Sequence, residues 1–591
     1  MGNNKYWQSL DQREETPAFK EQSAKEFVEE IPVFDYVEDA TNVESTGRRD
    51  FLKMMGVGVS AATLASACKI PVKKAVPYVF NLDQSSRIPE LMPGVADYYS
   101  SSYAEGGDFS SILVKTRENR PIKIEGNTAA PYNKGATTAR AQASVLDLYD
   151  VARITQPKKK GESITWEQVD KEVVAQLDKI AQAGGKIVVL TNTNYSLVTE
   201  SALKTFKEKY PTTEVVAYDP VSLYAMRKAN KETLGSAIIP TYLFDEAQII
   251  AGFNCDFLGG WVNASENTKR YSTNRVPTKE NPNMSRHYQF QSHVTITGAS
   301  ADYKFAIKPS EEKAALIALY NKIAASTGAS ALSNVNVGEL QEGINKLAAE
   351  LLANKGKSIV VSGTNNTDIQ LLTNAINALL GNYGATIDTV NTLNLKQGND
   401  EALKALADDN SVKAILLVGA NPVYDTPFAD KFKAMIEKAE LSVSFSERED
   451  ESAALAQYIT PVSHYLESWD VLEPKKGFIS FVQPTINQLF DTRQAAVSLN
   501  AFAGQKVDAY ELVKDLGSRY TTNFPSILGN SSWQSALQTG FVLQDNAGGQ
   551  LSPNINATVS AINTQLPTST GVELIVYESV ALADGKQSNN P

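Results

Sequence analysis

The sequence is poor in the side chains that bind metals. Its 591 residues include two cysteines, Cys68 and Cys255, and three histidines, His287, His293 and His464. An iron–sulfur cluster needs about four thiolates, so this chain cannot build one from its own cysteines. A disulfide framework is excluded for the same reason, and three histidines leave little material for a zinc site. We therefore predict no metal site in this chain.

The sequence also lacks an excess of basic residues. It contains 56 Lys and Arg against 67 Asp and Glu, a net charge of −11. Binding to nucleic acid phosphates needs a basic face, so a nucleic-acid partner is not expected. Hydrophobic residues make up 42% and charged residues 21%, which excludes a disordered chain, a fibre or a polytopic membrane protein. The length allows about four domains.

A short segment near the N-terminus is typical of an export signal. The adjacent Arg48 and Arg49 precede Phe-Leu-Lys and a weakly apolar run of small residues, Met54–Ala67. The run is shorter than the ~20 residues of a membrane-spanning helix. This pattern predicts a twin-arginine signal and a location at the periplasmic face of the bacterial inner membrane. The alternative is a short amphipathic helix that opens a domain.

The apolar run ends in a pattern that resembles a lipobox. In Leu64-Ala-Ser-Ala-Cys68 the leucine lies one residue farther from the cysteine than usual. An acylated Cys68 would hold the chain firmly on the membrane. The alternative is an idle or buried thiol.

Alternating strand and helix patterns predict an α/β fold with two doubly wound parallel-sheet domains. A small mixed region precedes them and an irregular segment follows them, with a boundary at the basic linker Gln156–Glu162. The predicted parts are a polar tail (1–45), the signal (46–68), a mixed α+β region (75–165), two α/β domains (166–310 and 311–485) and a C-terminal segment that reads as truncated (486–591).

Continuous apolar runs predict strands that are buried on both faces. Residues 110–117 and 120–125 are predicted to form a hairpin, and residues 201–209 a helix. The other predicted strands are 186–192, 214–219, 247–254, 358–364, 414–419, 441–447, 458–461 and 572–577.

Several segments resemble molybdopterin oxidoreductases, in the order that the family has them. Ala414–Pro422 is similar to the family's "G-x-N-P" turn, and Asn377–Gly384 to its "L-x-G-x-x-G" helix end. Ser463–Asp470 and Gln483–Gln494 look like its polysulfide and tetrathionate reductase branch. The resemblance covers roughly residues 95–580 and implies a pterin-guanine dinucleotide cleft near Gly419, Asn421 and Pro422.

The departures from the family pattern concern its metal ligands. Tyr99–Ala104 stands where catalytic members begin a cysteine cluster, and Thr138 takes the place of the last cluster cysteine. A hydroxyl cannot replace a thiolate on cluster iron. Arg140 takes the place of the family's lysine, and Gln457 that of its "A-D-x-V-L-P" aspartate.

A molybdopterin-type chain with an export signal and no cluster cysteines resembles the first half of the B subunit of bacterial alternative complex III, a quinol-oxidising complex that passes electrons to cytochrome c or an oxygen reductase. The resemblance implies a cofactor-free scaffold with a vestigial cleft and no catalytic residue. It also implies partners: an iron–sulfur domain, cytochrome c subunits that carry haem, and quinol-binding membrane subunits. The chain would reach the membrane through a lipid or through these partners.

Two other functions remain open from the sequence. One is an active enzyme of the polysulfide, thiosulfate or tetrathionate reductase type, with molybdenum held by a bis-pterin guanine dinucleotide. The other is a periplasmic lipoprotein that binds a small ligand. Cys255 is either a molybdenum ligand or, as we favour from its place at a strand end, a half-buried free thiol.

Three polar features have a structural and a functional interpretation. We favour a packed, hydrogen-bonded His464 over a proton-handling one. We interpret Ser285–Phe290 with His293 as a solvated loop or subunit contact, with a cleft lining as the alternative, and Glu447–Glu451 as a charged loop after a strand.

Overall fold

A computed structural model describes residues 16–17 and 95–591, except 280–281, 528, 570 and 590–591. The chain divides into two units, Met1–Val72 and Lys73–Pro591, and nearly all described residues belong to the second. Apart from residues 16–17, the predicted polar tail lies outside the described residues. The predicted export signal with Arg48 and Arg49 and the predicted lipid attachment at Cys68 lie outside them too.

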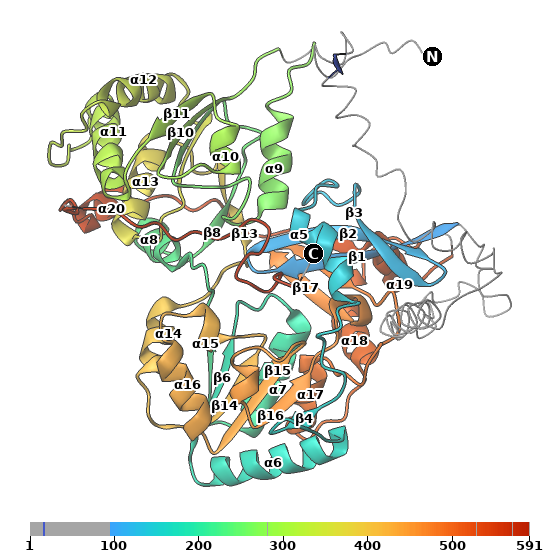
Figure 1. The fold of residues 1–591 in the computed structure, drawn as a ribbon. Helices are drawn as coiled ribbons and strands as arrows, with labels where there is room; N and C mark the ends of the chain where they lie inside the picture. Colours follow the sequence, from blue (N-terminus) through green and yellow to red (C-terminus); the bar gives the residue numbers. More distant parts are fainter. Residues whose placement is uncertain (1–15, 18–94, 280–281, 528, 570, 590–591) are drawn as a thin grey trace. The chain divides into compact units, whose positions relative to one another are not determined.

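The larger of two parallel sheets is built around five parallel strands (Figure 1). In chain order these strands are β6 (Lys186–Thr191), β7 (Thr213–Ala217), β14 (Val412–Val418), β15 (Leu441–Ser446) and β16 (Tyr458–Pro461). Across the sheet the order is β7-β6-β14-β15-β16, with the short antiparallel β4 (Lys158–Lys159) and β5 (Glu162–Ser163) at the β16 edge. The strand order therefore reverses between β6 and β14.

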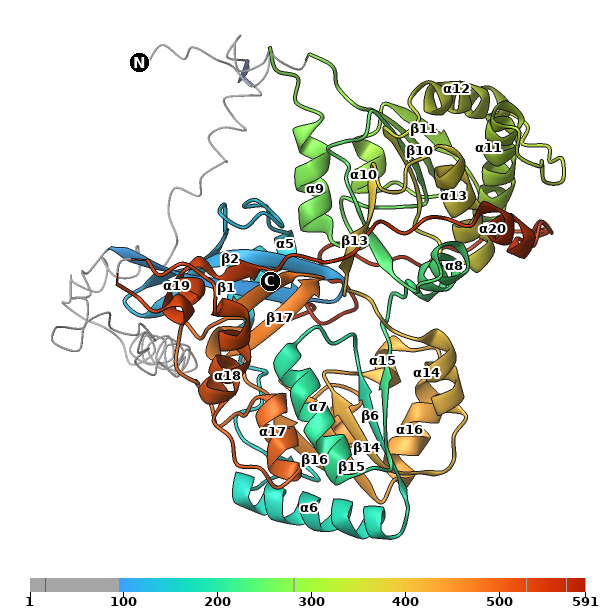
Figure 2. The ribbon, with the colours of Figure 1, turned by 180° about the vertical axis from the view of Figure 1, so that it is seen from behind.

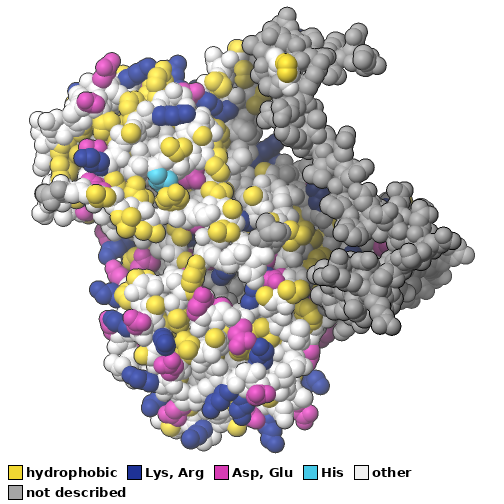
Figure 3. Space-filling view, in the orientation of Figure 1, with side chains coloured by type: hydrophobic (Ala, Val, Ile, Leu, Met, Phe, Trp, Pro, Cys, Tyr) yellow, Lys and Arg dark blue, Asp and Glu magenta, His cyan; other side chains and the backbone are white. Residues whose placement is uncertain are grey.

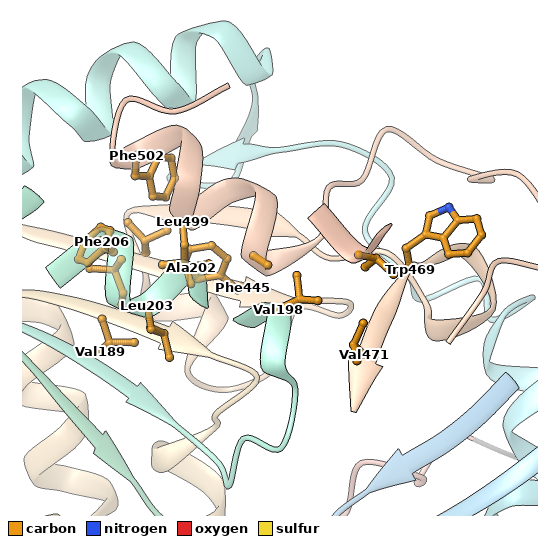
Figure 4. Close-up of a cluster of buried hydrophobic side chains, with 14 of the residues drawn as sticks. Val189, Val198, Ala202, Leu203, Phe206, Phe445, Trp469, Val471, Leu499 and Phe502 are labelled. Atoms are coloured by element: carbon orange, nitrogen blue, oxygen red, sulfur yellow. The ribbon is translucent and has the colours of Figure 1, made fainter. Parts of the chain in front are cut away.

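Side chains that alternate along the strands bury both faces of this large sheet. Ile187 and Val189 pack toward α6 (Trp166–Gln182), α7 (Leu197–Lys209) and α17 (Ala495–Phe502), as Figure 4 shows for part of the cluster. Val188 and Leu190 pack on the opposite face, toward α14 (Asp400–Ala407) and α16 (Ala429–Lys438). Each fully buried aliphatic side chain stabilises the fold by about 1.5–3 kcal/mol, which explains the unbroken apolar runs.

The small sheet is also parallel, with the order β11-β10-β9-β12. Its strands are β9 (Ile249–Phe253), β10 (Arg286–Gln291), β11 (Tyr303–Ala306) and β12 (Ser358–Ser362). One face packs against α11 (Glu312–Thr327), α12 (Leu340–Ala353) and α13 (Thr367–Leu379). The helices α9 (Ala264–Thr273) and α10 (Ile296–Ala299) complete this part of the chain (Figure 2). Its strand order reverses between β9 and β12.

Two antiparallel sheets accompany the parallel ones in the described chain. The predicted hairpin is confirmed as β2 (Asp108–Arg117) and β3 (Arg120–Gly126), and β1 (Ala96–Glu105) extends it. The second sheet was not predicted; its order is β19 (Phe541–Leu543), β18 (Phe478–Val482), β17 (Asp470–Lys475), β13 (Ile387–Leu393) and β8 (Ile239–Tyr242).

The α/β fold class with two parallel sheets is confirmed, but the predicted boundary between residues 310 and 311 is wrong. Val188 of β6 pairs with Ile415 of β14, so strands from both predicted domains share the large sheet. The small sheet is inserted between them in the sequence. The predicted linker Gln156–Glu162 is no boundary either, because β4 pairs with the edge strand β16.

The C-terminal segment differs from its prediction in two ways. It contains α17, α18 (Ala509–Thr521), α19 (Ser532–Thr539) and α20 (Ile555–Ala561), so it is largely helical before residue 562. Residues 572–577 do not form the predicted strand, since they belong to none of the sheets in the described chain. Their apolar side chains, including Val572, Leu574 and Val576, are exposed. Among the described helices, none has the length and apolar character needed to cross a membrane.

Candidate functional site

A cavity lies at the carboxyl ends of β14 and β15, close to where the large sheet reverses its strand order. It has a volume of about 690 Å³, and its lining includes Gly419 and Asn421, the residues predicted to border a pterin cleft. Open α/β sheets bind ligands at such positions. The third predicted residue, Pro422, is buried at the start of α15 (Pro422–Asp425).

The polar atoms of the predicted turn are already bonded within the chain. The Asn421 side-chain Nδ2 donates to Glu451 Oε2 at 2.8 Å, and its Oδ1 accepts from Ser452 Oγ at 2.7 Å. Gly419 adopts a left-handed φ of 63°, which glycine accepts at no steric cost, and its N–H donates to the Phe445 carbonyl. The turn is therefore tied to neighbouring loops of its own chain.

A segment near the C-terminus crosses this edge of the sheet; we refer to residues 578–589 as the crossing segment. Lys586 Nζ donates to Oδ1 of Asn192 at 2.7 Å, and Asn192 directly follows β6. Gln587 donates to a carboxylate oxygen of Glu105 at the end of β1. The crossing segment thus brings a lysine to the β6 side of the position where the strand order reverses.

The same segment neutralises a buried arginine. Glu578 accepts from Arg140 Nη1 at 3.3 Å and lies 3.6 Å from Lys396 Nζ. Arg140 also lies 3.4 Å from Asp108 Oδ2, so two carboxylates surround the residue that stands in the family lysine's place. Sequence reasoning missed Glu578 and Lys586, because nothing local in the sequence ties them to these distant partners.

Most of the charged residues that line this cavity are acidic. Burial raises the pKa of Asp425 and that of Glu447 to about 7, which reflects the free energy of holding a carboxylate away from water. Burial by itself would lower the pKa of Lys586, but Asp584 and Glu105 outweigh it and raise that pKa. An anionic ligand such as a pyrophosphate would meet these carboxyl groups.

The corresponding crevice of the small sheet is filled by Glu312, the first residue of α11. Its carboxylate accepts hydrogen bonds from Asn254, which follows β9, and from Ser362 and Thr364 at the end of β12. Glu312 is 1% exposed, and burial raises its pKa although the three hydrogen bonds lower it. A glutamate at a helix start normally signals only a favourable helix-dipole contact, so this role of Glu312 could not be predicted from the sequence.

The segments that stand where the family has its iron–sulfur cluster ligands form regular secondary structure in this chain. Tyr99–Ala104 lies inside β1 and pairs fully with β2. Thr138 caps α5 (Ala139–Asp147), accepting a hydrogen bond from the Ala141 N–H. Both segments are thus built into ordinary secondary structure, and Thr138 has a capping role that a serine, threonine or asparagine serves well.

Cys255 is a free thiol inside an apolar cluster. It is fully buried rather than half-buried, and burial raises its pKa well above the usual value. The protonated thiol is a poor metal ligand, so the geometry favours the interpretation as a packed thiol. In the described residues no group of metal-ligating side chains is positioned to hold an ion.

Two of the three polar features, His464 and Glu447–Glu451, have the structural role that we favoured from the sequence. His464 is buried, its Nδ1 accepts from the Leu466 N–H, and burial holds its pKa well below the usual range. Glu447–Glu451 follows β15 as predicted, and it also forms a wall of the cavity.

The third feature, Ser285–Phe290, is not the solvated loop that was one of its two favoured interpretations; the other, a subunit contact, stays a prediction. Arg286–Phe290 lies in the buried strand β10 of the small sheet. The buried His287 and Gln289 bond each other in the strand, at 3.1 Å between His287 Nε2 and Gln289 Oε1. The polar residues of this strand interrupt the apolar run by which a buried strand is recognised in a sequence, so the strand was not predicted. His293 stacks on Tyr577.

The residues at the carboxyl ends of the two parallel sheets do not fit a bis-pterin guanine dinucleotide. Glu312 fills one sheet-end crevice, the crossing segment occupies part of the other, and acidic groups line the remaining cavity. The basic residues close to these crevices are committed to carboxylates of the chain, as Arg140 is to Asp108 and Glu578. A dinucleotide would have to displace these contacts and face like charge.

Comparison with known proteins gives relatives in sequence and in fold, although no family model matches the chain. The chain is 24% identical over 505 residues to a menaquinone reductase, molybdopterin-binding-like subunit, of Nitratidesulfovibrio vulgaris (strain Hildenborough), covering 78% of this chain and 72% of that protein. The structure resembles acetylene hydratase from Pelobacter acetylenicus with a TM-score of 0.53 and 13% identity, covering 76% and 72% of the two chains. The chain is therefore molybdopterin-oxidoreductase-like in fold.

Proposed function

We propose that this molybdopterin-oxidoreductase-like chain is a cofactor-free, non-catalytic scaffold subunit of a membrane-bound respiratory complex that reacts with a quinone. The observation that carries the proposal is that Glu312 fills one sheet-end crevice and that the crossing segment with Lys586 occupies part of the other. A chain that occupies its own ligand crevices keeps the fold and surface of an enzyme without its cofactor. The relative is named as a molybdopterin-binding-like subunit of a menaquinone reductase, which supports a place in a quinone-linked complex.

The finer proposal is alternative complex III, with electrons passing from quinol to cytochrome c or an oxygen reductase. The expected partners are an iron–sulfur domain, cytochrome c subunits and quinol-binding membrane subunits, at the periplasmic face of the inner membrane. On the described part of the face seen in Figure 3, acidic and basic side chains are interspersed without a continuous basic tract. This distribution supports protein partners over nucleic acid.

The test is the molybdenum content of the complex purified from native membranes through a tag on this chain. We expect close to zero molybdenum per chain by elemental mass spectrometry, because one crevice is filled and the other is partly occupied and lined by several carboxyl groups. A molybdenum enzyme purified in the same way from the same cells controls for metal loss and for molybdenum supply. About one molybdenum per chain would overturn the cofactor-free proposal and direct attention to the turn at Gly419.

The partner subunits are identified in the same purified preparation. We expect quinol-binding membrane subunits and haem proteins to copurify with the tagged chain in constant proportion. Recovery of the chain alone, under conditions in which other membrane complexes stay intact, would contradict the scaffold role. The molybdenum result and the partner result are independent, so each part of the proposal can fail separately.

A further inference from the structure

The carboxylate of Glu312 accepts hydrogen bonds on both of its oxygens, as a bound oxyanion would. Ser362 Oγ donates to Glu312 Oε1 at 2.7 Å. Asn254 Nδ2 and Thr364 Oγ1 donate to Oε2 at 2.8 and 2.7 Å. All three donors are neutral, and both carboxylate oxygens are used. These distances are typical of charge-assisted hydrogen bonds.

The carboxylate has no ion-pair partner in the described chain. The adjacent Lys313 is directed to Asp368, at 2.9 Å. A buried charge without a counter-ion is costly unless hydrogen bonds replace its hydration shell. The three donors and the first turn of α11 therefore carry the whole compensation.

Backbone contacts orient the donors toward Glu312, and the Glu312 carboxylate joins the two loops that carry them. Asn254 has a left-handed φ of 44°, and its Oδ1 accepts from the Ser292 N–H at 2.8 Å, which points its amide toward Glu312. Between the two hydroxyl donors stands Gly363, where a Cβ would lie 2.3 Å from the Asn254 carbonyl oxygen. Only a glycine allows this approach of the two loops. The site is thus preorganised by backbone geometry.

We propose that Asn254, Ser362 and Thr364 form a binding site for small oxyanions, and that Glu312 is its built-in ligand. The site lies where the strand order of the small sheet reverses, the position at which open α/β sheets bind ligands. Its ligand class is a carboxylate or an anion of similar size. This inference goes beyond the proposed function, because it concerns a site that stays available once its internal occupant is removed.

The test replaces the internal ligand by an external one. In the Glu312→Ala chain within the purified complex, we expect hydrogen exchange in peptides covering 249–262 and 358–366 to speed up by about tenfold or more, as the loops lose their anchor. Acetate or formate should restore slow exchange along a saturable curve, while chloride at equal ionic strength should not. The same acetate should leave the unaltered chain unchanged, because Glu312 fills the site.

The control is Glu312→Ala combined with Ser362→Ala and Thr364→Val, which lacks the hydroxyl donors. We expect acetate to have no effect on it. Equal rescue of both variants, or no saturable rescue of a folded Glu312→Ala chain, would overturn the proposal. Either result leaves the molybdenum measurement untouched, so the two proposals fail separately.

If Glu312→Ala does not assemble, the single variants Ser362→Ala and Thr364→Val retain the carboxylate and decide the question. Each should speed exchange in these peptides more at pH 8 than at pH 5, because the lost donor matters most when Glu312 is ionised. Equal effects at both pH values would show that the hydroxyl groups do not bind an anion, which contradicts the proposal.

Discussion

At the scale of single residues, burial raises the pKa of two carboxyl groups that line the cavity, those of Asp425 and Glu447. Asp425 ends α15, and its Oδ1 accepts from Tyr218 OH at 2.7 Å. Burial raises its pKa to about 7, although the hydrogen bond and Lys586 oppose the shift. Asp584 and Asp450 add like charge. The folded chain therefore favours the neutral acid.

The first prediction concerns Asp425→Asn. A carboxyl group whose folded pKa exceeds its unfolded pKa contributes stability below the unfolded pKa, near 4, and loses it as the pH rises through about 7. Asparagine removes the charge and can still accept from Tyr218. We expect the variant to be more stable than the unaltered chain by about 1–2 kcal/mol at pH 8 and by clearly less at pH 5, where only part of the difference between the two ionisation states has developed. Chemical unfolding at both pH values measures this difference.

The matched control is Asp515→Asn, on the surface of α18, where Asp515 pairs with Arg519. Exposed pairs contribute little, so its effect should be small at both pH values. A gain in stability for Asp425→Asn that is the same at pH 5 and pH 8 would contradict the assignment of a raised pKa.

The sequence allowed some of these residues to be placed and not others, for a physical reason. Gly419 and Asn421 were predictable as a turn because a strand pattern ends directly before them. Glu312 and Lys586 were not, because their roles depend on partners far away in the sequence, such as Ser362 and Asn192. Hydrogen bonds of this kind leave no periodic signal.

At the scale of elements, the hydrophobic pattern predicted where strands lie in the sequence but not which strands pair with one another. The strands β6, β9, β12 and β14 agree closely with the apolar runs that predicted them. Pattern does not say which strand pairs with which, so the insertion of the small sheet into the large one was missed. Pattern also predicted a strand at 572–577, where side chains favour β structure but no strand lies alongside in the described chain.

A second prediction concerns what holds the crossing segment in place. Lys586 is the cation among Asp584, Glu105, Asp425 and Asp219. Replacing it with glutamine leaves these carboxylates in mutual repulsion. We expect Lys586→Gln to release the segment, so that amide exchange at Ala583, Gly585 and Ser588 speeds up by about tenfold or more. Hydrogen-exchange mass spectrometry on the purified complex measures this.

The release should be stronger at pH 8 than at pH 5, because the raised pKa values of Glu105 and Asp425 leave these groups less charged in acid. Lys514→Gln is the control: Lys514 lies on the exposed surface of α18, next to Glu511. Unchanged exchange in the segment of Lys586→Gln would show that other contacts, such as Glu578 with Arg140, hold it alone.

At the scale of the whole molecule, the sheet topology bears on the proposed export route. The large sheet joins β6 to β14, more than two hundred residues later in the chain. Long-range parallel pairing of this kind forms slowly, and a chain of this type is best folded before it leaves the cytoplasm. The twin-arginine route carries folded proteins, which agrees with the proposed periplasmic location.

The last prediction tests that route through Arg48 and Arg49. The signal is an address read by a receptor, so replacing both arginines with lysine keeps the charge and removes only the recognised side chains. We expect the double variant to accumulate in the cytoplasm and to be depleted at least about tenfold from the purified membrane complex, measured by fractionation and quantitative mass spectrometry. The control replaces Arg117 and Arg120, at the β2–β3 turn, with lysine and should not change export. Equal export of the Arg48 and Arg49 variant would contradict the twin-arginine prediction while leaving the scaffold proposal open, since another route could deliver the chain to the same complex.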